Sequence, residues 1–304
     1  MATVPIDQLR AALEARGREL GFDDPRAARL ADHFLDAEMR GARGHGAERM
    51  RWLHGREATS ADARPELTER HEGLARYHAA GTIGYLALAE ALDAELADPP
   101  DGARLVVVAD CFPTGRLGYY AEAAAATDLL ALVTATSTPR IVHPDGGPAV
   151  LGTNPLCVGL PGTPPTIVDV SMGAITYGAV LTAAAAGRPL SPGVAIRPDG
   201  SHELDPGEIT GNRAGIAPFG AEQSYKGFAL ALLVELLCGA LAGLDGHAAV
   251  VLLARPAADA ATPLREAMTD RHVPGEGSRA RLDAARAAGV VELPDDLWAW
   301  LSPG

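Results

Sequence analysis

The stretch RLVVVAD, at residues 104–110, constrains the fold most strongly. Its run of valines predicts a buried strand, and the sequence GYYAEAAAATDLLALV that follows has the pattern of a helix and then another strand. Further strand candidates, separated by turns rich in glycine and proline, are PAVLGT, LCVGLP, TIVDVS and AAVVLL. We therefore expect a mixed α/β core from this point of the chain onward.

The segment before this core predicts mainly helices. Residues 6–40 have apolar side chains at the spacing of two amphipathic helices. Asp24 precedes Pro25, a pair typical of a helix start, so we expect Asp24 to cap the second helix. Residues 57–70 are polar and predict an exposed connection, whereas residues 73–96 again have a helical pattern.

Composition and charge exclude several classes of partner. The 304 residues include 26 Lys and Arg against 39 Asp and Glu, a net charge of −13, and no basic run is present to meet a nucleic-acid backbone. The three cysteines lack CxxC spacing, which argues against a disulfide framework or a zinc site and favours a reducing compartment. The N-terminus lacks the apolar core of a signal peptide, and the longest apolar run, at 228–244, contains Glu235. We expect a soluble cytoplasmic protein that binds neither nucleic acid nor membranes.

Common catalytic motifs are missing from the sequence. No GxGxxG joins a strand to a helix, which disfavours the usual dinucleotide-binding fold. No Walker loop, HExxH helix or GxSxG elbow is present, which disfavours the NTPase, zinc-protease and hydrolase classes. The nine histidines show no metal-ligand spacing, so we expect no metal site.

Three stretches carry candidate binding residues. Lys226 opens the apolar segment YKGFALALLVELLCGALAG, where a helix N-terminus would stabilise an anion such as a cofactor phosphate. The alternative is a buried core helix with a merely solvated Lys226. Asn154 before Pro155 predicts a turn. Asp169, at the end of an apolar strand, could accept hydrogen bonds from a ribose or an amide, or else cap the next segment.

Motifs along the whole chain follow the order of one known family. DAEMRGARGHGAERM is similar to the pattern DLRGxxSHGxxR, and GRLGYYAEAAA is similar to GxAGYY. GTNPL, DVSMG, YKGFALALLVELLCGALAG and VPGEGSR come after them. Together these stretches resemble the malate/L-lactate dehydrogenase family of NAD(P)H-dependent oxidoreductases, which is separate from the Rossmann lactate dehydrogenases.

The resemblance implies a homodimer with a non-Rossmann fold, in which helices flank a mixed or antiparallel sheet beside a helical N-terminal lobe. It implies three parts: the N-terminal lobe over 1–100, a cofactor-binding sheet domain over 101–255, and a C-terminal segment over 256–304. That last segment would complete the cofactor site and pack on the N-terminal lobe. Family members reduce a carbonyl or cyclic imine beside a carboxylate, or oxidise the 2-hydroxy acid. A small carboxylate substrate and NADH or NADPH are therefore the expected ligands.

Site roles are also implied by the resemblance. The proton donor falls on His45, the arginine that binds the substrate carboxylate on Arg49, and a substrate-holding threonine on Thr153. The cofactor positions fall on Asp169, Val170, Ser171, Tyr225, Lys226, Pro274, Gly275 and Glu276. The first two roles suit the chemistry, because imidazole titrates near pH ~6.5 and a guanidinium can clamp a carboxylate bidentately. The alternatives are a solvated loop histidine and a surface ion pair.

The sequence departs from the family pattern at three site positions. Gly44 replaces the serine before the histidine, Pro113 falls where a histidine is usual, and Ala179 falls where an acidic residue or lysine is usual. Three functions therefore remain open: redox turnover, slow or on an unusual substrate; a binding protein that has lost turnover; and non-redox chemistry on a carboxylate substrate. The sequence does not choose between NADH and NADPH.

Overall fold

The main sheet of the protein has seven strands, of which most pairs are antiparallel. The computed structural model describes residues 1–56, 60–243, 246–268, 271 and 273–302. The strand order is β2-β3-β4-β12-β5-β8-β9, and of these neighbours only β3 and β4 pair in parallel. The strands are β2 (Glu66–His71), β3 (Leu74–His78), β4 (Ala103–Ala109), β5 (Leu130–Ala135), β8 (Leu156–Leu160), β9 (Thr166–Val170) and β12 (Ala248–Ala254). The predicted mixed sheet is confirmed, and it contains the strands predicted at RLVVVAD, LCVGLP, TIVDVS and AAVVLL. The strand predicted at PAVLGT also forms, as β7 (Gly146–Leu151), but in a separate sheet.

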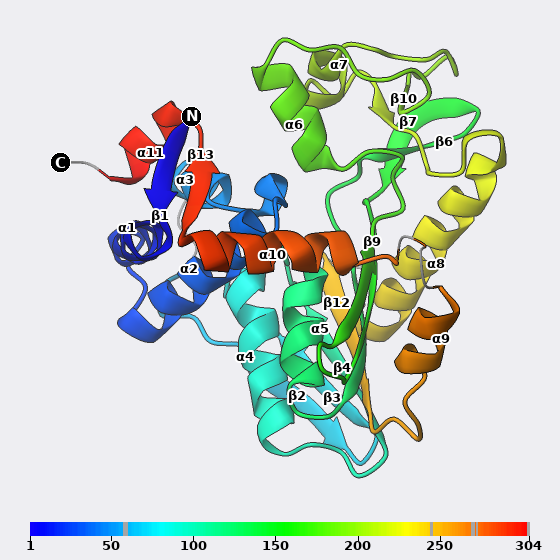
Figure 1. The fold of residues 1–304 in the computed structure, drawn as a ribbon. Coiled ribbons are helices and arrows are strands. Elements are labelled where there is room, and N and C mark those ends of the chain that lie inside the picture. The colour runs from blue at the N-terminus through cyan, green and yellow to red at the C-terminus, as the bar shows by residue number, and fades with distance from the viewer. Residues whose placement is uncertain (57–59, 244–245, 269–270, 272, 303–304) are drawn as a thin grey trace.

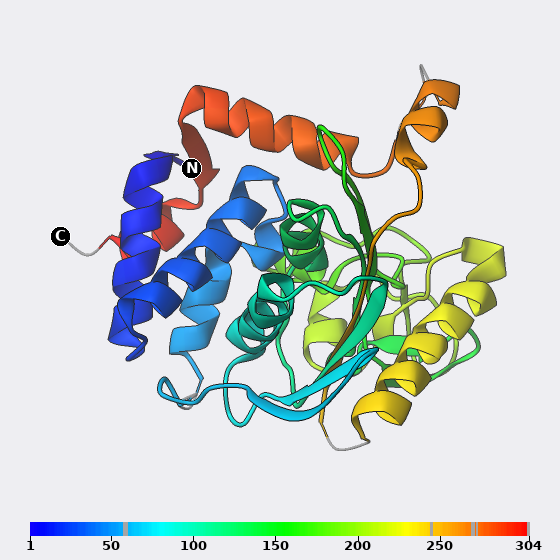
Figure 2. The same ribbon diagram turned by 90° about the horizontal axis from the view of Figure 1, so that it is seen from below.

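Helices cover both faces of this sheet (Figure 2). α4 (Gly84–Ala97) and α5 (Leu117–Ala125) pack on one face, and α8 (Ser224–Ala242) packs on the other. Along β4, Val106 and Val108 join the core under α4 and α5, whereas Val107 joins the core under α8. Successive side chains of a strand point to opposite faces, so a strand covered on both sides has to be apolar throughout. This explains the uninterrupted valine run.

The two ends of the chain form one helical lobe (Figure 1). β1 (Ala2–Pro5) pairs with β13 (Val290–Leu293), and one apolar core joins the first helices to the last ones. The helices of this lobe are α1 (Ile6–Glu19), α2 (Asp24–Met39), the 3₁₀ turn η1 (Arg43–His45), α3 (Glu48–His54) and α11 (Asp295–Leu301). α10 (Glu276–Ala288) crosses from the lobe to the upper edge of the main sheet, where α9 (Ala261–Ala267) precedes it. The predicted helical N-terminal lobe is confirmed, while the predicted division into three parts stays a prediction.

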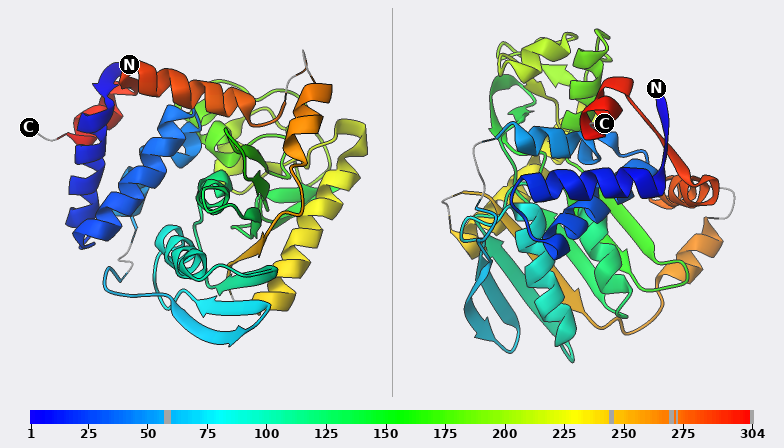
Figure 3. Two further views of the ribbon diagram at one scale, coloured as in Figure 1. Left: turned by 60° about the horizontal axis from the view of Figure 1, so that its bottom comes forward. Right: turned by 90° about the vertical axis from the view of Figure 1, so that its left-hand side faces the viewer.

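A small unit, which we call the upper lobe, stands above the sheet in Figure 1 and in the right-hand view of Figure 3. Its four strands have the order β10-β11-β6-β7 and are separate from the main sheet. The elements are β6 (Ile141–His143), β7 (Gly146–Leu151), α6 (Tyr177–Ala185), β10 (Ala195–Ile196), α7 (Pro206–Thr210) and β11 (Gly215–Ile216), followed by the turn η2 (Ala221–Gln223). A separate apolar cluster around Val180 and Ile216 holds it together. α6 of this lobe lies against η1 of the helical lobe.

Three expectations about the N-terminal region are wrong in detail. Asp23, not Asp24, caps α2, because the Asp23 carboxylate accepts the Arg26 N–H at 3.0 Å. The polar segment that we expected to be a connection ends in the exposed strand β2, and its residues 57–59 lie outside the described part of the chain. The helical pattern expected from residue 73 begins only at Gly84, because Leu74–His78 form β3 instead. Pairing with β4 decides the conformation of β3, and local periodicity does not register such a tertiary contact.

The apolar helix α8 is not the buried core helix that the sequence offered as an alternative. Leucines at five of its positions are between 38% and 64% exposed, namely Leu230, Leu232, Leu233, Leu236 and Leu237. By length and composition the segment Ala221–Ala242 could also cross a membrane, which is weak evidence on its own. An apolar face of this size usually marks a contact with another surface.

Candidate functional site

A cavity of about 1230 Å³ lies where the helical lobe, the main sheet and the upper lobe meet. Drug-sized ligands occupy pockets of roughly 300–1,000 Å³, so this volume accommodates a dinucleotide together with a small acid. Eight of the predicted site residues line it: His45, Arg49, Thr153, Asp169, Ser171, Pro274, Gly275 and Glu276. They come from sequence positions more than two hundred residues apart, which the fold brings to one space.

Three predicted cofactor residues do not line this cavity. Val170 is 46% exposed at the end of the edge strand β9, and Tyr225 is 59% exposed at the start of α8. Lys226 is exposed beside Tyr225, with its ammonium 5.8 Å from the centre of that ring. The roles of these three residues stay predictions.

A buried glutamate on α2, Glu38, holds the loop that carries His45. Glu38, near the end of α2, is 7% exposed, and its Oε1 accepts the Ala47 N–H at 2.8 Å. A Cβ on Gly46 would lie 2.2 Å from the same oxygen, so glycine is required for this approach. Burial raises the pKa of Glu38 to about 7, with the Ala47 hydrogen bond opposing the shift. The loop conformation therefore depends on a carboxyl group that titrates near neutral pH.

From the other side, the same loop rests on the upper lobe through two glycines. A Cβ on Gly44 would lie 2.6 Å from the Gly178 Cα, and a Cβ on Gly178 would lie 2.5 Å from the Gly44 Cα. These backbones are therefore in direct contact, with no room for a side chain on either residue. The Gly44 carbonyl also accepts the Arg49 Nε–H at 2.6 Å, which holds the carboxylate-binding candidate against the loop. Gly44, which sequence comparison marked as a loss, is thus a packing requirement of this structure.

The surroundings of His45 favour its neutral form. Desolvation, and then the positive charges of Arg49 and Arg116, lower the pKa of His45 to about 4. At pH 7 the free protein therefore has a neutral imidazole, which can accept a proton.

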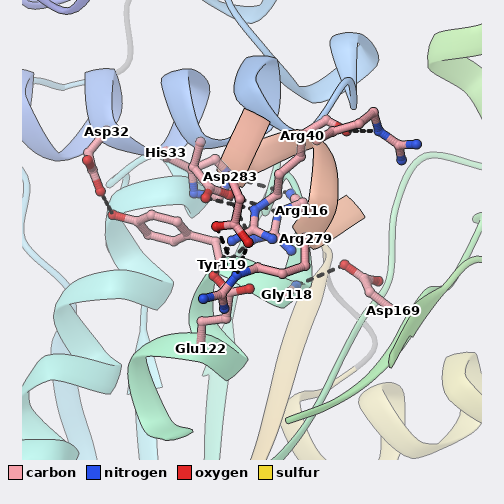
Figure 4. A network of polar contacts seen from close by, with 12 residues as sticks. Asp32, His33, Arg40, Arg116, Gly118, Tyr119, Glu122, Asp169, Arg279 and Asp283 are labelled. Carbon is pink, nitrogen blue, oxygen red and sulfur yellow. Dashed lines mark hydrogen bonds and ion pairs between the residues drawn. The ribbon is translucent and has the colours of Figure 1, made fainter. Parts of the chain in front are cut away.

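A buried network of ion pairs forms another wall of the cavity (Figure 4). Arg116 donates to the Asp36 carboxylate at 2.7 and 3.1 Å, and Arg40 donates to Asp36 at 2.8 Å and to Glu122 at 2.6 Å. Beside it, the Asp169 carboxylate accepts the Gly118 N–H at 2.8 Å, at the start of α5. Desolvation raises the pKa of Asp169, and the Gly118 hydrogen bond and Arg116 oppose that shift. The network fixes the position of Asp169 relative to α5.

Positive charge gathers in this cavity although the chain as a whole is acidic. Eight arginines line it, against four acidic residues. The arginines are Arg40, Arg49, Arg56, Arg116, Arg140, Arg265, Arg279 and Arg281, and the acids are Glu122, Asp169, Glu276 and Asp283. A cleft of one sign attracts ligands of the other sign, so the cavity is suited to anions.

Sequence reasoning missed most of these groups. Glu38 and Arg116 lie inside the quoted motifs but were given no role, and Arg140 lies in none of them. The contacts of all three residues join distant segments of the chain. One signal was available: Arg49, Trp52 and Arg56 recur at helical spacing, and in the structure both guanidiniums lie over the Trp52 ring. Of the residues that depart from the family pattern, Pro113 lines the cavity and Ala179 is exposed outside it.

Solved structures that are similar to this chain include two dehydrogenases. One from Sinorhizobium meliloti is 28% identical and superposes with a TM-score of 0.84, over 99% of this chain and 97% of that one. A malate dehydrogenase from Entamoeba histolytica, 18% identical, shares the fold with a TM-score of 0.86, over 99% and 96% of the two chains. The fold and the anion-suited cavity thus define a protein of the dehydrogenase and reductase class.

Sequence relatives give the same class. An L-sulfolactate dehydrogenase from Methanothermobacter thermautotrophicus is 30% identical over 75% of this chain and 67% of its own length. A Δ1-pyrroline-2-carboxylate/Δ1-piperideine-2-carboxylate reductase from Pseudomonas putida is 30% identical over 80% of this chain and 72% of its own length. The model of the malate/L-lactate dehydrogenase family matches residues 4–261, and the chain belongs to this family.

Proposed function

We propose that the protein is an NAD(P)H-dependent oxidoreductase that interconverts a small 2-oxo or 2-imino acid and the corresponding 2-hydroxy or 2-amino acid. The observation that carries the proposal is the shared cavity of His45 and Arg49, which lie four residues apart and line it together with Thr153. Within the described part of the chain, the Arg49 side chain forms one hydrogen bond, through Nε, which leaves its terminal nitrogens for a ligand. This pair supplies an anchor for a carboxylate and a base beside it.

The cavity has features that fit a nicotinamide dinucleotide. α10 begins at Glu276 without a side-chain cap. The Glu276 N–H donates to the Val273 carbonyl at 3.2 Å, and among the described residues the Gly277 and Ser278 N–H groups remain for an anion such as a pyrophosphate. Gly275 has a φ of +91°, and a Cβ there would lie 2.0 Å from the Ile167 carbonyl oxygen, so only glycine allows α10 to start this close to β9. Asp169 and Ser171 at the end of β9 supply hydrogen-bond partners for a ribose or a carboxamide.

A nicotinamide cofactor, when bound, would supply or accept the hydride at the substrate carbon. Arg49 holds the substrate carboxylate and thereby fixes which face of the carbon is presented. His45 transfers the proton: it donates to the oxygen or nitrogen during reduction and accepts that proton during oxidation. Thr153 is positioned for the substrate by its N–H, which donates to the Ser137 hydroxyl at 3.2 Å, and by its carbonyl, which accepts the Met172 N–H.

The test is the absorbance of the reduced nicotinamide at 340 nm, followed with a panel of 2-oxo and cyclic 2-imino acids and with each cofactor in turn. We expect turnover in the unchanged protein, a loss of about 10²–10⁴-fold in His45→Ala, and a rise in KM in Arg49→Gln. Absence of both cofactor binding and nicotinamide-dependent turnover across the panel would refute the proposal.

A second function has one observation in its favour. Within the described part of the chain, no group forms a hydrogen bond with the His45 ring, so its orientation depends on packing alone. The protein could accordingly bind the cofactor and a carboxylate without redox turnover, or with non-redox chemistry. Cofactor binding without hydride transfer, together with a His45→Ala variant that binds as well as the parent, would favour the binding role. Conversion of a carboxylate without net consumption of nicotinamide would favour the non-redox one.

We also propose that the protein is a cytoplasmic homodimer that associates through α8. Leu233 and Leu236, 56% and 64% exposed, lie at the centre of its apolar face, and a second copy would cover this face. Light scattering should give the mass of a dimer for the parent and that of a monomer for Leu233→Glu. Leu264→Glu on α9, at a leucine that is 60% exposed, is the matched control and should remain dimeric. A monomeric parent would contradict the proposal.

A further inference from the structure

A side chain of α10 holds the start of the loop at residues 40–47, which carries His45 and which we call the His45 loop. The Arg281 Nε donates to the Arg40 carbonyl at 2.7 Å. Gly41 has a φ of +73°, and a Cβ there would lie 3.1 Å from the same Nε, so glycine permits this close approach. One side chain therefore joins the helix of the proposed cofactor segment to the loop of the proposed proton donor.

The terminal nitrogens of Arg281 remain available to a ligand. Arg281 lines the cavity, and among the residues that the structure describes it forms one hydrogen bond, through Nε, and pairs with no carboxylate. Arg49 has the same arrangement, because its Nε donates to the Gly44 carbonyl of the same loop. In the described part of the chain, these two are the cavity arginines that bind the backbone of the His45 loop. Each of them can hold the loop and an anion at the same time.

Arg281 shares a face of α10 with the first turn of that helix. It follows Gly277 by four residues and Ser278 by three, the two spacings at which helical residues are neighbours. Helical side chains tilt toward the N-terminus, so the Arg281 side chain lies over this turn, and Gly277 has no side chain to cover it. The guanidinium and the N–H groups of the turn are thus suited to one anionic group.

We propose that Arg281 is a positioning residue that couples cofactor binding to the His45 loop. Its terminal nitrogens bind an anionic group of the dinucleotide, while its Nε holds the Arg40 carbonyl. The bound cofactor then fixes the loop in the conformation in which His45 and Arg49 meet the substrate. This inference rests on the proposed oxidoreductase function and adds to it that each ligand strengthens the binding of the other.

A purely structural role for Arg281 would be to cap α2. Its bond satisfies a carbonyl at the end of that helix, where a positive charge is also favourable. Loss of a cap lowers the stability of the protein. It does not change how one ligand affects the affinity of the other, so this mutual effect separates the two roles.

The test measures the affinity of oxamate, an unreactive analogue of a 2-oxo acid, by titration calorimetry. Each protein is titrated alone and when saturated with whichever of NADH and NADPH binds. We expect the cofactor to tighten oxamate binding to the parent by about 10-fold, a usual size for coupling between two sites. In Arg281→Gln this factor should fall below about threefold, and the cofactor Kd should rise about 10-fold through the loss of a charge-assisted hydrogen bond. Arg281 is exposed, so the variant should fold.

Arg286→Gln is the matched control, because Arg286 is exposed further along α10 and lies outside the cavity. It should keep both the cofactor Kd and the coupling. Arg281→Lys should recover cofactor affinity more than coupling, since an ammonium lacks the rigid fork that directs donors to two acceptors. Unchanged coupling in Arg281→Gln, together with a lower unfolding temperature, would assign Arg281 to capping α2 alone and overturn the proposal.

The same titrations separate this inference from the proposed function. Binding of the cofactor and oxamate to the parent without a mutual effect rejects the coupling, while turnover of a 2-oxo acid with nicotinamide leaves the oxidoreductase function standing. Coupling that is lost in Arg281→Gln supports the role of Arg281 even where no 2-oxo acid turns over. Failure of both NADH and NADPH to bind rejects the two proposals together.

Discussion

The contact between Gly44 and Gly178 leads to the most specific prediction, the effect of Gly178→Ala. The new Cβ would lie 2.5 Å from the Gly44 Cα, whereas ordinary contacts begin at 3.4 Å. Either η1 or the first turn of α6 therefore has to move by roughly 1 Å. Because His45 follows Gly44 directly, a movement of η1 displaces the imidazole, and a misplacement of this size can lower kcat by about 10²-fold.

Two opposing effects on stability can be compared for the same variant. Alanine in place of glycine favours a helix by about 0.5–1 kcal/mol, and Gly178 lies in the first turn of α6. Overpacking costs about 1–3 kcal/mol, so the clash outweighs the helical gain. We expect a net loss of at most about 2 kcal/mol, which leaves the fold intact. The main consequence is therefore on catalysis rather than on folding.

The assay is steady-state kinetics with a separate measurement of cofactor affinity. kcat of Gly178→Ala should fall by about 10²-fold while the cofactor Kd changes by less than about threefold, because α10 and β9 are untouched. Gly102→Ala is the control, since a Cβ there meets nothing within 4 Å. Gly44→Ala should have a similar effect, and the double variant should lose less than the sum of the two. A folded Gly178→Ala with kcat near that of the parent would refute the argument that this contact positions His45.

Three further predictions concern protonation and stability. The pKa of His45 is lowered to about 4. Oxidation needs neutral imidazole, so kcat/KM for oxidation should stay constant as pH falls from 7 toward 5, whereas kcat/KM for reduction should fall about tenfold per pH unit above the pKa. An inflection near pH 6.5 in either pH profile would contradict this. The pKa of Glu38 is raised from 4.5 to about 7, which adds stability that is present below pH 4.5 and is lost as pH rises through 7. Urea unfolding should therefore show that Glu38→Gln raises the free energy of unfolding by up to about 3 kcal/mol at pH 8 and leaves it unchanged at pH 4. Equal increases at both pH values would argue against this linkage. Asn154→Ala should lower the free energy of unfolding by about 2–4 kcal/mol. The buried side-chain amide of Asn154 donates to the Ala231 carbonyl and to the Glu235 carboxylate of α8, and the residue has a backbone φ of +37°. Unfolding midpoints that are unchanged within error would show that these bonds contribute nothing.

Local patterns predicted the elements that are stabilised by their own sequence. In β4, both faces are buried, and the sequence shows this as an unbroken run of valines. In α1 and α2, one face is buried, and the sequence shows this as apolar residues at helical spacing. β2 and β3 were missed for the opposite reason. Their residues Glu66–His78 are polar or mixed, and they become strands only because β3 finds the edge of β4, some thirty residues further along the chain.

The candidate site was predictable where one short motif carries both partners. His45 and Arg49 share a loop and a helix, so their spacing already places them together. GTNP was interpreted as a turn, yet Asn154 is fully buried and ties the loop of Thr153 to α8, through bonds to residues about eighty positions away. No pattern in a single sequence records such a partner. The same holds for Arg140, whose partners Tyr177 and Asn212 are distant in the sequence.

Gly44 shows how a single sequence can mislead about a site. Compared with a motif, it is a lost hydroxyl beside the proton donor, and it suggests a loosened histidine. In the structure it is half of a contact whose other half, Gly178, lies 134 residues later, and a side chain on either would push the lobes apart. The glycine at position 44 thus removes a hydroxyl beside His45 and at the same time allows backbone contact with Gly178. Whether that exchange preserves catalysis depends on how firmly packing alone can hold an imidazole, and Gly178→Ala measures that directly.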